Sequence, residues 1–127
     1  MTKEARLSLS DATTALSAVL LGGGFALFRL RLIVPRETVG LCAAGNAPEW
    51  CVPRHWVLLG QYYNTFGWAA LALGLLAFVS GRRMFAGLAI GAGVAAVVNY
   101  NGTPGVIGAA LGLAAWGSLI ARRPGWR

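Results

Sequence analysis

The sequence contains two cysteines and one histidine, side chains that could bind a metal ion or exchange thiols and disulfides. Cys42 and Cys51 are separated by residues 43–50, and His55 follows shortly after. A catalytic thiol pair is usually a closer Cys-X-X-Cys pair, in which the neighbour lowers the pKa of the attacking thiol. A closed zinc site requires a fourth ligand besides these three residues. The spacing therefore favours a structural disulfide between Cys42 and Cys51, with a membrane thiol-redox module as an alternative.

Acidic residues, which could act as general acids, general bases or ion ligands, are few. The four are Glu4, Asp11, Glu37 and Glu49, and all lie at or outside the ends of the apolar stretches described below. The sequence has no Ser-His-Asp set, no carboxylate pair suited to a pocket, no phosphate-binding loop and no cluster of metal ligands. We therefore predict that the chain is not an enzyme, with no catalytic residues, no metal site and no cofactor of its own.

Arginines late in an apolar stretch form a second candidate site, because ionisable residues inside a membrane usually have a specific role. Arg29 and Arg31 either extend to the outer headgroups or pair with an acid or carbonyl of a partner subunit. Polar residues expected at the same depth would bond between helices, or bind a quinone, or contact a pigment or haem contributed by a partner. The candidate contact residues are Arg29, Arg31, His55, Gln61, Asn64 and Asn99.

The composition places these residues in a membrane protein. The chain has 127 residues, of which 57% are hydrophobic and 12% charged. A soluble domain carries about 25% charged residues, and so small a globule cannot bury this much apolar surface. The formal net charge of +7 is spread along the chain. A nucleic-acid partner is therefore not expected, whereas contact with lipids is.

The elements that must position these residues are four apolar helices, each close to the length of about 20 residues that a bilayer requires. They are predicted at 12–34, 56–80, 84–100 and 104–121, with an outer loop at 35–55. Thr103 and Pro104 are typical of a helix start. The fold expected is a single all-α integral membrane domain over 1–127. The first stretch is predicted to be a retained span, not a cleaved signal peptide.

The basic residues predict the orientation, because cytoplasmic segments carry more Lys and Arg. With both termini inside, the inner side holds Lys3, Arg6, Arg82, Arg83, Arg122, Arg123 and Arg127, and the outer side holds Arg29, Arg31, Arg36 and Arg54. The expected location is a bacterial inner membrane with both termini cytoplasmic. The loop with both cysteines would then lie in the oxidising periplasm, where disulfides persist. A bridge there would stabilise the loop by roughly 2–3 kcal/mol.

Small residues recur at helical spacing and predict close packing of helices. They are Gly60, Gly67, Ala70, Gly74, Ala77 and Gly81 in the second stretch, and Gly105, Gly108 and Gly112 in the fourth. Within lipid, association of helices depends on close van der Waals contact, which small residues allow. These stripes therefore predict a tight bundle or docking onto a partner.

These observations favour an accessory or structural subunit of a larger inner-membrane complex, of respiratory, photosynthetic or transport function. A hetero-oligomer with other membrane subunits is expected more than a homo-oligomer. The alternative is a homo-oligomeric channel or small-solute transporter, with a pore between copies lined by Asn64, Asn99 or backbone.

Overall fold

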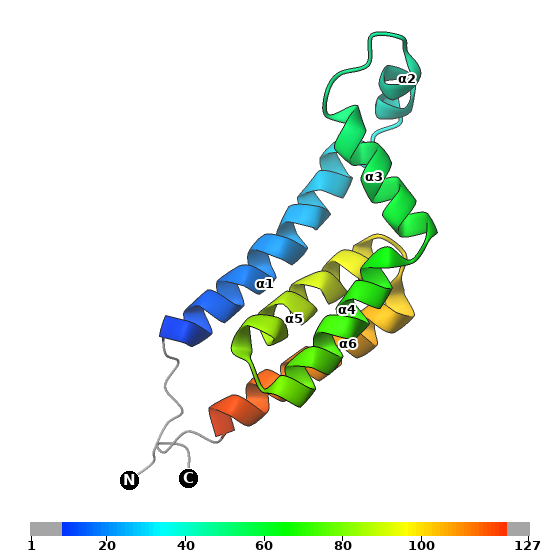
Figure 1. Cartoon of the computed structure of the whole chain (residues 1–127). Coiled ribbons are helices and arrows are strands. Elements are labelled where there is room, and N and C mark those ends of the chain that lie inside the picture. The colour runs from blue at the N-terminus through cyan, green and yellow to red at the C-terminus, as the bar shows by residue number, and fades with distance from the viewer. Residues whose placement is uncertain (1–8, 122–127) are drawn as a thin grey trace.

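The computed structural model describes residues 9–121, and every regular element in this range is helical (Figure 1). The elements are α1 (Leu9–Phe28), the π-helical turn η1 (Arg29–Ile33), α2 (Glu37–Ala43), α3 (Cys51–Tyr62), α4 (Thr65–Ser80), α5 (Arg83–Val98) and α6 (Gly102–Ala121). The all-helical prediction is confirmed.

Helix α5 is the centre of the fold. It packs against α4 and α6, which also pack against each other, and α1 lies along its remaining side. Helices α2 and α3 lie beyond this bundle, at the end of α1 (Figure 1). The buried residues of α5 are all alanine or glycine, namely Ala86, Gly87, Ala89, Gly91, Ala92, Gly93, Ala95 and Ala96. Because these side chains are so small, the neighbouring helix backbones approach α5 closely.

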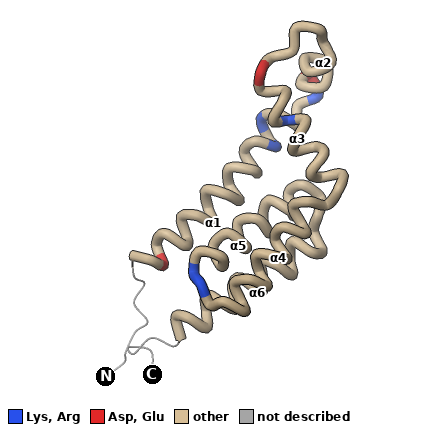
Figure 2. Tube along the Cα trace, viewed as in Figure 1, with Lys and Arg blue, Asp and Glu red and all other residues tan. Residues whose placement is uncertain are grey.

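Several helices of the described range are compatible with a membrane. Residues Leu9–Ile33 and Gly102–Ala121 form two helices long and apolar enough to cross one, and α3 with α4 would add a third if the bent pair counts as one span. Helix α5 is apolar but shorter. Charged residues lie toward the two ends of the molecule, and the middle of the bundle has none (Figure 2).

The stretch 56–80 differs from the single helix predicted for it. Helices α3 and α4 are bent by 71° relative to each other. Asn64 lies at the break with a φ of 57°, in the left-handed region that asparagine adopts more readily than most residues. The hydropathy of this stretch continues through the break, which is why the sequence indicated one helix.

The expected outer loop at 35–55 also differs, because it contains α2 and the first turn of α3. Pro53 lies in that first turn, where its missing N–H removes no helical hydrogen bond. The other predicted helices are found with shifted ends. Helix α6 begins at Gly102, so that Pro104 lies in its first turn.

Candidate functional site

A cluster at the end of the bundle is organised around Arg29, and we call Arg29, Gln61, Asn99, Tyr100 and Asn101 the arginine cluster. Arg29 Nη1 donates to Gln61 Oε1 at 2.8 Å and to Asn99 Oδ1 at 3.1 Å. Its guanidinium carbon lies 4.6 Å from the centre of the Tyr100 ring. The cation is thus held by neutral amide oxygens and an aromatic face, a favourable cation–π arrangement.

The turn between α5 and α6 positions two of these amides. Asn99 is fully buried, and its Nδ2 donates to the carbonyl of Ala95 at 2.8 Å, which leaves Oδ1 to accept from Arg29. Asn101 Nδ2 donates to the backbone oxygens of Gln61 and Asn99 at 3.1 and 3.2 Å. Asn101 Oδ1 accepts from the N–H of Gly67 at 3.4 Å. The turn therefore connects α3, α4 and α5 through side-chain amides.

The arginine cluster is suited to holding helices together, since buried polar groups stabilise a fold only when they are hydrogen-bonded. It brings together Arg29, Gln61 and Asn99, three of the predicted contact residues, all with partners inside the chain. It does not include the other three. Arg31, His55 and Asn64 are exposed.

The π-helical turn provides the end of α1 with a second link. Val34 N–H donates to the carbonyl of Arg29 at 2.9 Å, a bond spanning five residues. A π-turn changes which carbonyls have a partner within the helix, and here Leu32 O accepts from Arg54 Nε of α3 at 2.8 Å. Arg54 thus connects the first turns of α3 to η1.

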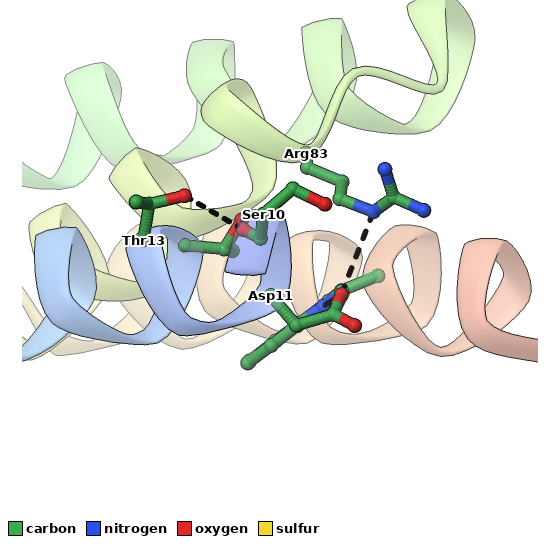
Figure 3. Close-up of polar contacts among 6 residues, drawn as sticks. Ser10, Asp11, Thr13 and Arg83 are labelled. Atoms are coloured by element: carbon green, nitrogen blue, oxygen red, sulfur yellow. Dashed lines mark hydrogen bonds and ion pairs between the residues drawn. The ribbon is translucent and has the colours of Figure 1, made fainter. Parts of the chain in front are cut away.

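Asp11, at the opposite end of α1, was not among the predicted site residues. It is only 1% exposed, and its Oδ1 accepts from Trp116 Nε1 of α6 at 2.9 Å. Arg83 of α5 extends toward the same oxygen, with its Nε 3.5 Å away (Figure 3). Among the described residues this is the one salt bridge. A sequence signal existed, because an indole N–H in an apolar helix needs an acceptor.

Hydroxyl groups support the helix turns around Asp11. Thr13 and Thr14 each donate to the carbonyl of Ser10 at 2.8 Å, and Ser17 donates to that of Thr14 at the same distance. A Cβ added at Gly87 of α5 would lie 2.5 Å from Ser17 Oγ. The polar start of α1 therefore packs directly on the α5 backbone.

The small residues of α4 and α6 lie at close contacts between helices. Gly74 and Gly108 bring α4 against α6, whereas Gly105 and Gly112 lie against α5. The buried residues of α4 are Gly67, Ala70, Gly74 and Ala77, and those of α6 are Gly105, Gly108, Gly112 and Ala115. A Cβ added at Gly74 would lie 2.5 Å from Gly108 O. Two residues of the predicted stripe are placed elsewhere. Gly60 lies on α3 beside Phe66, and Gly81 caps α4 with a φ of 67°.

The predicted disulfide between Cys42 and Cys51 is confirmed, with the two Cα atoms 5.5 Å apart. It joins the end of α2 to the start of α3, and both cysteines line a pocket of about 650 Å³. Within residues 9–121 there is no free cysteine and no group of three His, Cys, Asp or Glu side chains able to hold a metal ion.

These contacts join α1, α3, α5 and α6 at two polar levels and leave long apolar surfaces between them. No protein-family model, curated protein or solved structure matches the chain. Proposals about function therefore rest on the geometry above.

Proposed function

We propose that the chain is a four-span accessory subunit of a larger bacterial inner-membrane complex, with no catalysis of its own. The observation that carries the proposal is the position of α1, which packs along α5 and leaves the rest of its surface uncovered. Along α1 and the η1 turn that continues it, Leu16, Val19, Leu20, Leu27 and Leu30 are each between 56 and 67% exposed. A span attached along one side offers its other sides to neighbouring subunits.

Two polar levels support a four-span arrangement. Asp11 of α1 and Arg29, the first residue of η1, are 18 residues apart, which at 1.5 Å per residue is about 27 Å. Arg83, the first residue of α5, and Asn99, which follows its last residue, are 16 residues apart, or about 24 Å. Both lengths approach the roughly 30 Å hydrocarbon core of a bilayer. Helices α1, α4, α5 and α6 would then cross it, and α3 would lie at the outer surface.

The orientation follows from the chain's basic residues and its disulfide. Seven of the eleven lysines and arginines fall on the side of the predicted cytoplasmic termini, in line with the positive-inside rule. The disulfide then lies on the opposite side, which in bacteria is oxidising. We therefore propose that both termini are cytoplasmic.

A structural role also agrees with how the polar residues are used. Asn99, proposed as a channel-lining residue in the alternative function, is fully buried and bonded to Arg29. Asp11 is bonded to Trp116. These contacts favour an accessory subunit over a channel between identical copies.

The test is site-specific photocrosslinking in native membranes, with benzoylphenylalanine at Val19 of α1 and, as a matched control, at Val106 of α6. Both side chains are more than half exposed. We expect an adduct from Val19 with a different membrane protein, which mass spectrometry would identify, and a weaker adduct or none from Val106. An adduct only between copies of this chain would favour the alternative function, a homo-oligomeric channel or transporter. Crosslinks to lipid alone would reject the accessory role.

A further inference from the structure

An apolar cleft of about 340 Å³ lies between α1 and α3. The residues that line it are Leu20, Leu21, Gly24, Phe25, Phe28, Pro53 and Val57. Phe25 also contacts the Phe66 ring of α4, with ring centres 5.1 Å apart, so the cleft borders the bundle. The cleft extends along α1 from residue 20 to residue 28, about 12 Å at 1.5 Å per residue.

A basic residue adjoins the cleft in sequence, although Arg54 itself lines the neighbouring pocket beside the disulfide. Arg54 follows the lining residue Pro53 and bonds through Nε to the carbonyl of Leu32, four residues beyond the lining residue Phe28. Only Nε takes part in that bond, so the two terminal nitrogens can still donate. Arg31 is exposed on the same π-helical turn. Among the described residues, neither arginine forms an ion pair with Glu37 or Glu49.

We propose that this cleft binds one acyl chain of an anionic phospholipid, with the lipid phosphate at Arg54. The lining offers only apolar side chains, which suits a hydrocarbon chain, whereas a quinone ring would need hydrogen-bond donors for its carbonyls. The guanidinium group of Arg54, bonded to Leu32 O one turn beyond the lining residue Phe28, favours a phosphate, which arginine binds with charge-assisted hydrogen bonds. In the proposed orientation the cleft opens in the outer leaflet.

The proposal uses the membrane placement given above but does not depend on the accessory role. A chain that has no protein partner in the crosslinking experiment could still bind this lipid. Conversely, a chain that binds no lipid in the cleft could still crosslink to a partner through Val19.

The test is native mass spectrometry of the purified chain in micelles supplied with dioleoyl phosphatidylglycerol or dioleoyl phosphatidylcholine. For the wild-type protein we expect one retained phosphatidylglycerol and weaker retention of phosphatidylcholine. Gly24→Leu should fill the cleft and reduce retention by about tenfold. Gly23→Leu is the matched control, because Gly23 does not line the cleft and an added Cβ meets nothing within 4 Å at either position.

The headgroup contact is tested separately with Arg54→Gln, and Arg36→Gln serves as its control at the same end of the molecule. Arg54→Gln should lower the ratio of retained phosphatidylglycerol to retained phosphatidylcholine about tenfold, the effect of losing a charged hydrogen bond. Arg36→Gln should leave this ratio unchanged. Circular dichroism verifies that each variant is folded. Equal retention in Gly24→Leu and Gly23→Leu, or equal binding of both lipids by the wild type, would overturn the proposal. A quinone that copurifies with the wild-type protein and is lost in Gly24→Leu would overturn it too.

Discussion

At the residue scale, the two ends of the bundle hold their charges differently. Asp11 has an ion pair with Arg83 and an indole donor, whereas Arg29 has two amide acceptors and an aromatic ring. Each arrangement compensates a charge removed from water, which would otherwise cost several kcal/mol. Both charges connect helices distant in sequence, so both should contribute to the stability of the fold.

Trp116→Phe should destabilise the bundle because it removes the donor to the buried carboxylate of Asp11. A hydrogen bond to a charged group contributes about 1.5–3 kcal/mol, and we expect a loss of this size in the free energy of unfolding. Trp68→Phe is the control, since Trp68 is exposed on α4, and it should change the value by less than about 0.5 kcal/mol. The measurement is unfolding in SDS followed by far-UV circular dichroism. Equal effects of the two substitutions would show that the Asp11 contact does not stabilise the fold.

Arg29→Lys should also be destabilising although it preserves the charge. Arg29 binds two acceptors and covers the Tyr100 ring with a planar group, which a compact ammonium does not reproduce. We expect a loss of about 1–2 kcal/mol, the value of one such hydrogen bond and part of the cation–π contact. Arg31→Lys should have almost no effect, because Arg31 is exposed. The same SDS titration distinguishes the two, and a neutral Arg29→Lys would contradict the assigned role.

At the element scale, the sequence predicts more about packing faces than about helix breaks. The spacing of Gly67, Ala70 and Gly74 places them on one side of a helix, and the structure has that side against α6. The bend at Asn64 is set by one left-handed residue within a continuously apolar stretch, so hydropathy does not reveal it. The contact between Arg29 and Gln61 depends on that bend, which orients α3 toward α1. Sequence spacing alone therefore could not predict the arginine cluster.

Gly108→Ala should be the most damaging alanine substitution in the contact between α4 and α6. The added Cβ would overlap the Ala70 carbonyl and lie 2.6 Å from the backbone nitrogen of Leu71, and backbone atoms cannot move aside as a flexible side chain can. Overpacking of this kind costs about 1–3 kcal/mol. Gly117→Ala, on the same helix, meets nothing within 4 Å and should stabilise α6 by about 0.5–1 kcal/mol. Opposite signs in SDS unfolding are the expected result. Two substitutions of equal sign would contradict the close approach.

At the scale of the whole molecule, the helices of the bundle differ in length. Helices α4 and α5 each have 16 residues, about 24 Å at 1.5 Å per residue, whereas α1 and η1 together cover the 25 residues Leu9–Ile33. The shorter helices determine where polar residues emerge, because Arg83 begins α5 and Asn99 directly follows its end. In the four-span arrangement proposed above, the bundle would match a hydrocarbon layer thinner than the average of about 30 Å.

Bilayer thickness should consequently change the stability of the fold. In phosphatidylcholine bilayers with 14-, 18- and 22-carbon monounsaturated chains, we expect the free energy of unfolding to be greatest in the thinnest. Mismatch costs fractions of a kcal/mol per Å, so a thick bilayer must thin around α5 or cover Arg83 and Asn99 with hydrocarbon. The decrement caused by Trp116→Phe should stay constant across the series, because its partner Asp11 is buried inside the protein. Maximal stability in the 22-carbon bilayer would show that the two polar levels do not mark the membrane boundaries.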